Sequence, residues 1–318
     1  MESNWKSRKV VVVGAGAVGS TFAYALAQKG LSEEIALIDA NYDLAEGQAL
    51  DLAHGLPFYP SVQIRVGQKQ DYADAQVIVI TAGAKQGPGE TRLALVKKNA
   101  GIIESIVDEV VEQNSQAVIL VASNPVDILT YVALKRSSWP TGRVIGSGTV
   151  LDSARFRYLL SQHCGIDVSN VHAYFLGEHG DSEFPAWSMT HIAGVAIDDY
   201  CPLCNKCNAW KYERERIVKT VKESAYHIIN YKGATYFAIG MAMVRIVGTI
   251  LQDQRSVLPV STLLNGEYGL SDVCLGVPCV IGQSGVRTIV DAPLYPEERT
   301  SLYQSASILQ SVLNELTG

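Results

Sequence analysis

A run of valines followed by three spaced glycines constrains the fold of this chain more than any other stretch. Residues 10–20 read VVVVGAGAVGS, which contains the pattern Gly-x-Gly-x-x-Gly at Gly14, Gly16 and Gly19. The valines predict a strand buried on both faces, and the residues after the glycines predict a helix that ends at Gly30. Such a strand–turn–helix unit is typical of a parallel sheet with crossover helices.

The same turn is suited to bind a dinucleotide. Gly14 permits the tight turn, Gly16 lets the backbone approach a pyrophosphate, and Gly19 allows close packing of helix on sheet. The helix N-terminus attracts the phosphates. Asp39 comes 20 residues after Gly19, at the end of the next apolar run, and can bond the ribose hydroxyls. Because its charge would repel a 2′-phosphate, NAD is favoured over NADP; the alternative is a tight turn that binds no ligand.

Strand and helix patterns alternate through the first half of the chain. Apolar runs predict buried strands at residues 9–16, 34–40, 75–83, 117–125 and 143–148. The pattern changes after about residue 147, and helices are then expected at residues 153–163, 212–230 and 297–316. We therefore expect an α/β fold: a Rossmann-type doubly wound parallel sheet over residues 1–146, followed by an α+β domain over residues 147–318.

The composition indicates a globular protein with a sizeable core. Hydrophobic residues make up 47% of the chain, and the formal net charge is −6, which lacks the basic excess of nucleic-acid binders. The run of four valines near the N-terminus is too short for a signal peptide, and no stretch approaches the roughly 20 apolar residues of a membrane span. We expect a cytoplasmic protein with neither nucleic-acid nor membrane partners.

Three of the six cysteines form the run CPLCNKC, at Cys201, Cys204 and Cys207. This spacing can hold zinc or an iron–sulfur cluster, but no second Cys-x2-Cys pair accompanies it. Free thiols are the default in a chain without an export signal. We expect three exposed thiols and no metal site.

Four further segments, taken together with the glycine pattern, carry a family resemblance. They read GAKQGPGETR (residues 83–92), SNPVD (123–127), LDSARFR (151–157) and FLGEHGDSEFP (175–185). In this order, and over essentially the whole chain, the segments closely resemble those of the lactate/malate dehydrogenases. Within that family the resemblance is to the lactate-specific enzymes of the allosteric bacterial type.

The resemblance implies a reversible, NAD-dependent interconversion of (S)-lactate and pyruvate, which moves a hydride and a hydroxyl proton. Histidine is suited to move a proton near neutral pH, and an adjacent carboxylate fixes its tautomer and favours its cation. The resemblance assigns these two roles to His179 and Asp152. It makes Arg155 the bidentate partner of the substrate carboxylate, and it places Arg92 on a mobile lid that polarises the substrate oxygen. The alternatives are that His179 is a surface-turn histidine, that Arg155 forms a surface salt bridge, and that Arg92 belongs to an ordinary helix start.

Other site positions follow from the resemblance. Asn124 is expected at the reacting oxygen, before a cis proline bond. Gln86 and Thr235 are expected to line the pocket at the methyl end of pyruvate, because an arginine in place of Gln86 would suit a dicarboxylate. The expected cofactor-binding residues are Gly14, Gly16, Val18, Gly19, Asp39, Ala82, Gly83, Ser123, Asn124 and Ile239.

Arg157 and His172 match positions that bind fructose 1,6-bisphosphate between subunits in the allosteric bacterial enzymes. We therefore expect this effector and a homo-oligomer, a tetramer in most of the family, in which two copies of each residue meet at a two-fold axis. The alternatives are that Arg157 is a solvated helix residue and that His172 only fills a strand position. For the chain as a whole, a malate or other 2-hydroxy acid dehydrogenase and a non-enzymatic dinucleotide-binding sensor stay open.

Overall fold

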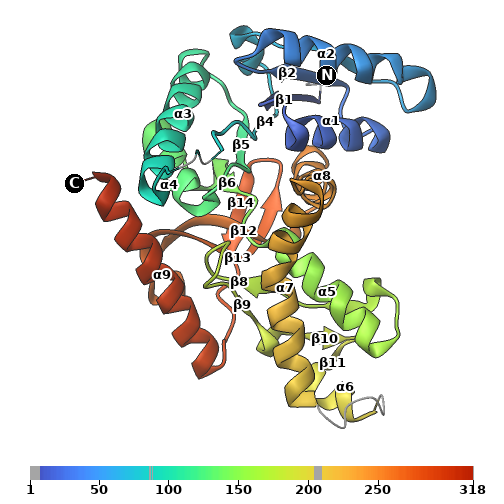
Figure 1. Ribbon diagram of the computed structural model, residues 1–318, viewed down its shortest axis with the longest axis vertical. Coiled ribbons are helices and arrows are strands. Elements are labelled where there is room, and N and C mark those ends of the chain that lie inside the picture. The colour runs from blue at the N-terminus through green and yellow to red at the C-terminus, as the bar shows by residue number, and fades with distance from the viewer. Residues whose placement is uncertain (1–7, 86, 88, 204–209, 318) are drawn as a thin grey trace, which may run out of the picture. The chain divides into compact units, whose positions relative to one another are not determined.

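The computed structural model describes residues 8–85, 87, 89–203 and 210–317, in two compact units that alternate along the chain (Figure 1). The first unit comprises the chain up to Ser147 together with Tyr236–Ser256 and Val280–Arg287. The second comprises Gly148–Thr235, Val257–Cys279 and the chain from Thr288 onward. The expected domain boundary between residues 146 and 147 stays a prediction. No helix in the described part of the chain is both long and apolar enough to cross a membrane.

Six parallel strands of the first unit follow the order β6-β5-β4-β1-β2-β3, which confirms the doubly wound sheet. Strands β1, β4 and β5 are buried along their whole length, which explains why their apolar runs are continuous rather than alternating. The order reverses at β1, which lies between β2 and β4, and ligands of such sheets bind beyond the carboxyl ends of the strands at this point. The strands are β1 (Lys9–Val13), β2 (Glu34–Ile38), β3 (Gln63–Val66), β4 (Val77–Ile80), β5 (Val118–Val121) and β6 (Val144–Gly146).

Two helix pairs of the first unit pack closely, α1 with α8 and α3 with α4. Helix α8 reaches α1 because Gly240 has no side chain: a Cβ there would lie 3.1 Å from Thr21 Cγ2. Neither α8 nor the edge strand β3 was predicted from the sequence. The helices are α1 (Ala17–Lys29), α2 (Tyr42–His54), α3 (Arg92–Glu112), α4 (Val126–Ser137) and α8 (Phe237–Leu251), with 3-10 turns η1 (Leu56–Phe58), η2 (Lys69–Tyr72) and η3 (Thr141–Arg143).

The second unit is of the α+β kind, with a core that includes Phe156, Phe175 and Ile217. Strands β11, β10 and β7 form one antiparallel sheet, and β8 pairs with β9. Its strands are β7 (Val171–His172), β8 (Phe175–Leu176), β9 (Phe184–Pro185), β10 (His191–Ile192), β11 (Val195–Ala196) and most of β12 (Ser256–Asn265) and β13 (Ser271–Gly282). The last strand, β14 (Gly285–Ile289), falls mostly within the Val280–Arg287 segment of the first unit. The helices are α5 (Val150–Cys164), α6 (Ile197–Leu203), α7 (Trp210–Lys232) and α9 (Pro296–Thr317), with 3-10 turns η4 (Val168–Asn170), η5 (Trp187–Met189) and η6 (Glu267–Gly269).

An ion cluster around the buried side chains of Lys9 and Asp71 joins the first residues of β1 and β2 to β3 and η2. Lys9 Nζ lies 2.6 Å from Asp71 Oδ1 and 2.8 Å from Asp74 Oδ1. Arg65 donates to Glu34 Oε1 at 2.5 Å and to Asp71 Oδ2 at 2.9 Å. Burial alone would raise the pKa of the Asp71 carboxyl, but the bonds from Arg65 and Lys9 hold it well below its usual range.

The cysteine run differs from the expectation of exposed thiols. Cys201 is buried and disulfide-bonded, so it is not a free surface thiol. It lies one turn after Ile197 on α6, and the same helix face is buried at both positions. Cys204 and Cys207 lie outside the described residues. The free cysteines of the described chain are Cys164, Cys274 and Cys279, all buried.

Candidate active site

The glycine-rich turn between β1 and α1 is shaped by close backbone contacts. Gly14 has a φ of 106°, which L side chains rarely adopt, and a Cβ there would lie 2.6 Å from Ala82 N. A Cβ at Gly19 would lie 1.9 Å from the Gly14 carbonyl oxygen. Gly16 differs, because it is exposed and no described atom lies within 4 Å of its would-be Cβ. The packing therefore requires glycine at the first and third positions, while the second keeps the space before the α1 N-terminus open.

Asp39 follows β2 directly and lies beside this turn. Its Oδ2 accepts a hydrogen bond from Ala15 N at 2.7 Å, and its Oδ1 accepts one from Asn41 N at 2.8 Å. These bonds fix a half-buried carboxylate next to the glycines at the carboxyl edge of the sheet. Val18, in the first turn of α1, is also half-buried.

The loops that follow β4 and β5 lie beside each other at the same edge. Ser123 Oγ donates to the Ala82 carbonyl oxygen at 2.5 Å. A Cβ on Gly83 would lie 3.7 Å from Ser123 Cβ, an ordinary contact. The Asn124–Pro125 peptide bond is cis, as the resemblance implied. The first unit thus brings Ala82, Gly83, Ser123 and Asn124 together near the glycine-rich turn.

Asn99 joins these two loops and was not predicted from the sequence. It is buried in α3, accepts a hydrogen bond from Ala84 N at 2.8 Å and donates one to the Asn124 carbonyl oxygen at 3.1 Å. The available signal was an amide between the apolar residues Val96 and Ile103. A buried amide in that place needs partners, and two loop backbones supply them.

The other expected positions fall at element ends. Arg92 is the first residue of α3 and is exposed, which suits a residue that meets its ligand from a lid. Ile239 is half-buried on α8, one residue before the glycine that packs on α1. Thr235 is half-buried and is the last residue of the segment Gly148–Thr235 of the second unit. Gln86 lies outside the described residues.

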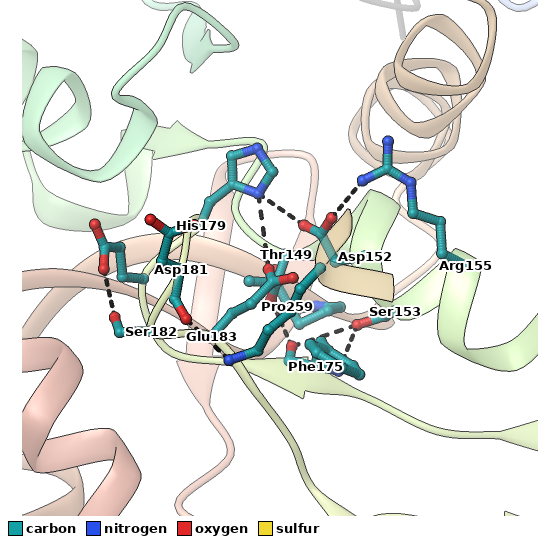
Figure 2. A network of polar contacts seen from close by, with 12 residues as sticks. Thr149, Asp152, Ser153, Arg155, Phe175, His179, Asp181, Ser182, Glu183 and Pro259 are labelled. Carbon is teal, nitrogen blue, oxygen red and sulfur yellow. Dashed lines mark hydrogen bonds and ion pairs between the residues drawn. The ribbon is translucent and has the colours of Figure 1, made fainter. Parts of the chain in front are cut away.

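In the second unit, Asp152 is held between a histidine and an arginine (Figure 2). Its Oδ2 lies 2.7 Å from His179 Nδ1, and its Oδ1 accepts a hydrogen bond from Arg155 Nη1 at 2.7 Å. Asp152 is 2% exposed, whereas the side chain of His179 is 26% exposed. Burial alone would raise the pKa of Asp152, but the charges of His179 and Arg155 lower it. The Asp152 carboxylate therefore stays ionised beside the imidazole.

Two hydroxyl groups of α5 and its N-cap bring the histidine segment to Asp152. Thr149 Oγ1 donates to the Phe175 carbonyl oxygen at 2.5 Å, and Ser153 Oγ accepts from Phe175 N at 2.8 Å. Strand β8 is thereby fixed on α5, and Gly177 follows it with a φ of 96°. A Cβ on Gly177 would lie 2.6 Å from Ser305 Oγ, so glycine is needed at the turn that leads to His179. The roles of Thr149 and Ser153 were not predicted from the sequence.

A second carboxyl group, Glu183, lies beneath the imidazole and was also missed. Its Oε2 lies 4.0 Å from His179 Nδ1, and the residue is 3% exposed. Burial and the neighbouring Asp152 charge raise the pKa of Glu183 well above its usual range. The sequence showed only an acid four residues after a histidine, a spacing that carries no signal in an irregular segment.

The pairing of Asp152 with His179 Nδ1 determines the chemistry available to the imidazole. The carboxylate holds the proton on Nδ1, so Nε2 is the nitrogen that can exchange a proton with a bound molecule. In Figure 2 the second ring nitrogen points away from the carboxylate. The arrangement is suited to general acid–base catalysis next to an arginine that can bind an anion.

Comparison with known proteins agrees with both units. Residues 8–146 match the profile of the lactate/malate dehydrogenase NAD binding domain, and residues 149–317 match that of the lactate/malate dehydrogenase alpha/beta C-terminal domain. The chain belongs to the lactate/malate dehydrogenase family. It is accordingly an NAD-dependent oxidoreductase, as expected from the glycine pattern and Asp39.

Several lactate/malate dehydrogenases are similar to this chain over its whole length. An L-lactate dehydrogenase of Treponema denticola is 56% identical over 98% of this chain and 99% of the relative. L-lactate dehydrogenase 1 of Clostridium acetobutylicum is 50% identical, with the same coverage. Among solved structures, the lactate dehydrogenase MGS-M5 from a Medee basin deep-sea metagenome is 45% identical, with a TM-score of 0.96 over 99% of this chain and all of that one. The minor L-lactate dehydrogenase of Enterococcus mundtii, in its ligands-bound form, is 44% identical, with a TM-score of 0.95 over 98% of this chain and 99% of that one.

The geometry of the glycine-rich turn in this lactate/malate dehydrogenase also fits NAD. A Cβ at Gly16 would enter the one open space of the turn, before the α1 N-terminus, where a pyrophosphate gains from the helix dipole. Asp39 lies where the ribose of a dinucleotide bound at this turn would reach. Bound NAD supplies the acceptor or donor of the hydride.

The two expected effector residues of the lactate/malate dehydrogenase come from helix α5 and strand β7. Arg157 Nε donates to the Val171 carbonyl oxygen at 2.8 Å, so its guanidinium lies against β7. His172, the next residue, is exposed, and it pairs in register with His191 of β10. His172 and His191 are thus cross-strand neighbours, and His191 was not predicted from the sequence.

Proposed function

We propose that this chain is an L-lactate dehydrogenase, which interconverts (S)-lactate and pyruvate with NAD. The observation that carries the proposal is the buried Asp152 carboxylate, 2.7 Å from both His179 Nδ1 and Arg155 Nη1. It joins a proton-transferring group on the segment after β8 to an anion-binding group on helix α5. The names of the relatives, which are 50–56% identical over nearly the whole chain, support the same activity.

In the direction of pyruvate reduction, the proton moves from His179 Nε2 to the ketone oxygen. Asp152 stabilises the imidazolium before transfer and keeps the ring in one orientation afterward. Arg155 uses one of its five N–H donors on Asp152, so the others remain to bind the substrate carboxylate in a bidentate pair. In lactate oxidation the same imidazole, now neutral, accepts the hydroxyl proton.

The remaining site residues have proposed positioning roles. Arg92 polarises the substrate oxygen once the segment before α3 covers the site and water leaves. Asn124 bonds the same oxygen, and Thr235 and Gln86 restrict the pocket around the methyl group. The cofactor is held by Gly14, Gly16, Val18, Gly19, Asp39, Ala82, Gly83, Ser123, Asn124 and Ile239.

Oxidation of NADH with pyruvate and then with oxaloacetate tests the proposal. Pyruvate should be preferred by at least roughly a hundredfold in kcat/KM, because the second carboxylate of oxaloacetate would be unpaired beside neutral Gln86. Gln86→Arg should shift the preference toward oxaloacetate. Equal turnover of both substrates by the unmodified protein would contradict the lactate assignment and favour a broader 2-hydroxy acid dehydrogenase.

We further propose that fructose 1,6-bisphosphate activates the enzyme, as a cytoplasmic homotetramer, at Arg157 and His172. The exposed His172 beside the Arg157 guanidinium supports this, because two copies of the pair across a two-fold axis give four cationic groups for two phosphates. The effector should lower the KM for pyruvate and promote tetramers, and Arg157→Gln should abolish both effects. Unchanged saturation curves and sedimentation at roughly millimolar effector would rule the site out.

A further inference from the structure

We propose that Glu183 is a positioning residue that extends the pH range over which His179 stays protonated, by giving up its own proton when the imidazole gains one. The inference rests on the proposed function, because His179 must be the acid of pyruvate reduction for the effect to appear in catalysis. It assigns a role to a carboxyl group that the proton transfer described above does not use.

Glu183 is a buried carboxyl group whose ion-pair neighbour is the titratable imidazole of His179. It is 3% exposed, and its Oε2 has no hydrogen-bond partner in the described part of the chain. This oxygen lies 4.0 Å from His179 Nδ1. A buried, unpaired carboxylate is costly, so the group keeps its proton until a positive charge forms beside it.

The charged groups that face Glu183 come from three directions. Helix α5 contributes Asp152, whose charge opposes ionisation of Glu183, and Arg155 is bound to Asp152 itself. Its own segment contributes His179, and α7 contributes Lys222, whose Nζ donates to the Asp181 carbonyl oxygen at 2.9 Å. Lys222 and a protonated His179 are the two groups that favour the carboxylate form.

A further neighbour is uncharged. Helix α9 contributes Ser305, whose hydroxyl lies 2.9 Å from that of Ser182. The only one of these groups whose charge changes during the reaction is therefore His179. Glu183 and His179 must titrate together, since an ionised Glu183 stabilises the imidazolium and the imidazolium eases the ionisation of Glu183.

The coupling acts in a definite direction. In the enzyme with a neutral imidazole, Glu183 holds its proton. When pyruvate and NADH require the imidazolium, Glu183 releases its proton to solvent, and the carboxylate left behind stabilises the new cation. The imidazolium therefore persists to a higher pH than Asp152 alone would allow.

Glu183→Gln tests this, because glutamine has the same shape but cannot ionise. At about pH 6, pyruvate reduction should stay within about threefold of wild type, since Asp152 alone is enough to keep the imidazole protonated in mildly acidic solution. The alkaline midpoint of kcat/KM should fall by about one pH unit. Asp181→Asn is the matched control: it removes an exposed charge from the same segment, two residues from both groups, and should leave the midpoint in place.

An unchanged or raised midpoint in Glu183→Gln, or a uniform loss at every pH, would overturn the proposal and indicate a packing role. Infrared spectroscopy of the wild type covers the case in which the variant does not fold. At a pH where the enzyme with NADH shows the band of a protonated carboxyl group, binding of oxamate, an isostere of pyruvate, should abolish that band; a band that persists would contradict the coupling. Lack of pyruvate reduction by the wild type would instead refute the proposed function.

Discussion

Two buried charge clusters of this protein differ in how completely their charges are matched. In the first unit, Asp71 forms ion pairs with both Lys9 and Arg65, and Glu34 forms a further ion pair with Arg65. In the second unit, Asp152 has Arg155 and His179, while the nearby Glu183 Oε2 has no described hydrogen-bond partner. The charges of the first cluster stay fixed near neutral pH, whereas in the second cluster the charge of Glu183 depends on whether the imidazole is protonated.

The difference shows that buried carboxyl groups of one fold can either stay ionised and support the structure or change charge with a titrating neighbour. A carboxylate with permanent cations has its pKa pushed below the working range and cannot respond to protons, as at Asp71. A carboxyl group that depends on a titrating partner responds whenever that partner changes, as at Glu183. The comparison predicts that mutations in the two clusters affect different measurements.

The largest expected effect is that of His179→Ala on catalysis. Loss of the proton donor should lower kcat/KM for pyruvate reduction by about 10⁴-fold, the upper part of the range for general acid–base groups. The urea unfolding midpoint should hardly move, because the ring is partly exposed. Steady-state kinetics and urea titration on one preparation check this. Near-full activity in the variant would remove the proposed acid from the mechanism.

Asp152→Asn should lower kcat/KM by about 10³-fold, since the imidazolium loses its charge partner and the ring its fixed tautomer. The KM for pyruvate should rise as well, because Arg155 is no longer held by a carboxylate. Initial rates over a range of pyruvate concentrations separate the two effects. If kcat fell but KM did not change, Arg155 would be positioned by other contacts.

Asp71→Asn should instead act on stability, and kcat should stay unchanged. Removing one partner of a buried charge network leaves the others unmatched, at a cost of about 3 kcal/mol in the free energy of unfolding. Asp108→Asn is the control, because its carboxylate binds Arg136 at 2.6 Å in an exposed pair and its loss should leave the urea midpoint unchanged. Equal effects of the two substitutions would contradict the distinction between matched buried charge and surface charge.

The smallest effect concerns the acid range. The folded pKa of Asp71 lies below its unfolded value, so its contribution to stability is present above the unfolded pKa and is lost as the pH falls toward the folded pKa. Wild-type stability should therefore decline below about pH 5 with a component that Asp71→Asn lacks. Urea titrations between about pH 3 and pH 7 measure it. Parallel curves for both proteins would assign acid lability to other carboxylates.

Local patterns allowed the nucleotide half of the fold to be predicted from the sequence. The glycine-rich turn encodes its own geometry within six residues, and strands β1, β4 and β5 are continuously apolar because both faces are buried. Strand β3 was missed because its residues, QIRV, carry the polar side chains of a sheet edge. Helix α8 is distant in sequence from α1, on which it packs, so nothing local indicated its place.

The candidate site was predicted through the resemblance, residue by residue, and what lay outside its motifs was missed. Thr149, Ser153 and Asn99 act through bonds to backbone atoms that only the folded chain brings near. Glu183 matters because of a burial that no neighbouring residue in the sequence reveals. Cys201 was misjudged for the same reason: an amphipathic turn of α6 buries it, although the run around it reads as polar.

The alternation of the two units along the chain bears on how members of such a family can recombine. A crossover near residue 146 between two parental genes would take α1 from one parent and α8 from the other, although these helices share an interface. The contact of Gly240 with Thr21 would then join unrelated surfaces, and a side chain in place of the glycine would meet the second parent's helix. Productive chimeras therefore require the exchange of Tyr236–Ser256 together with the N-terminal segment. Segments that pack on each other must then come from the same parent, even where they are distant in the sequence.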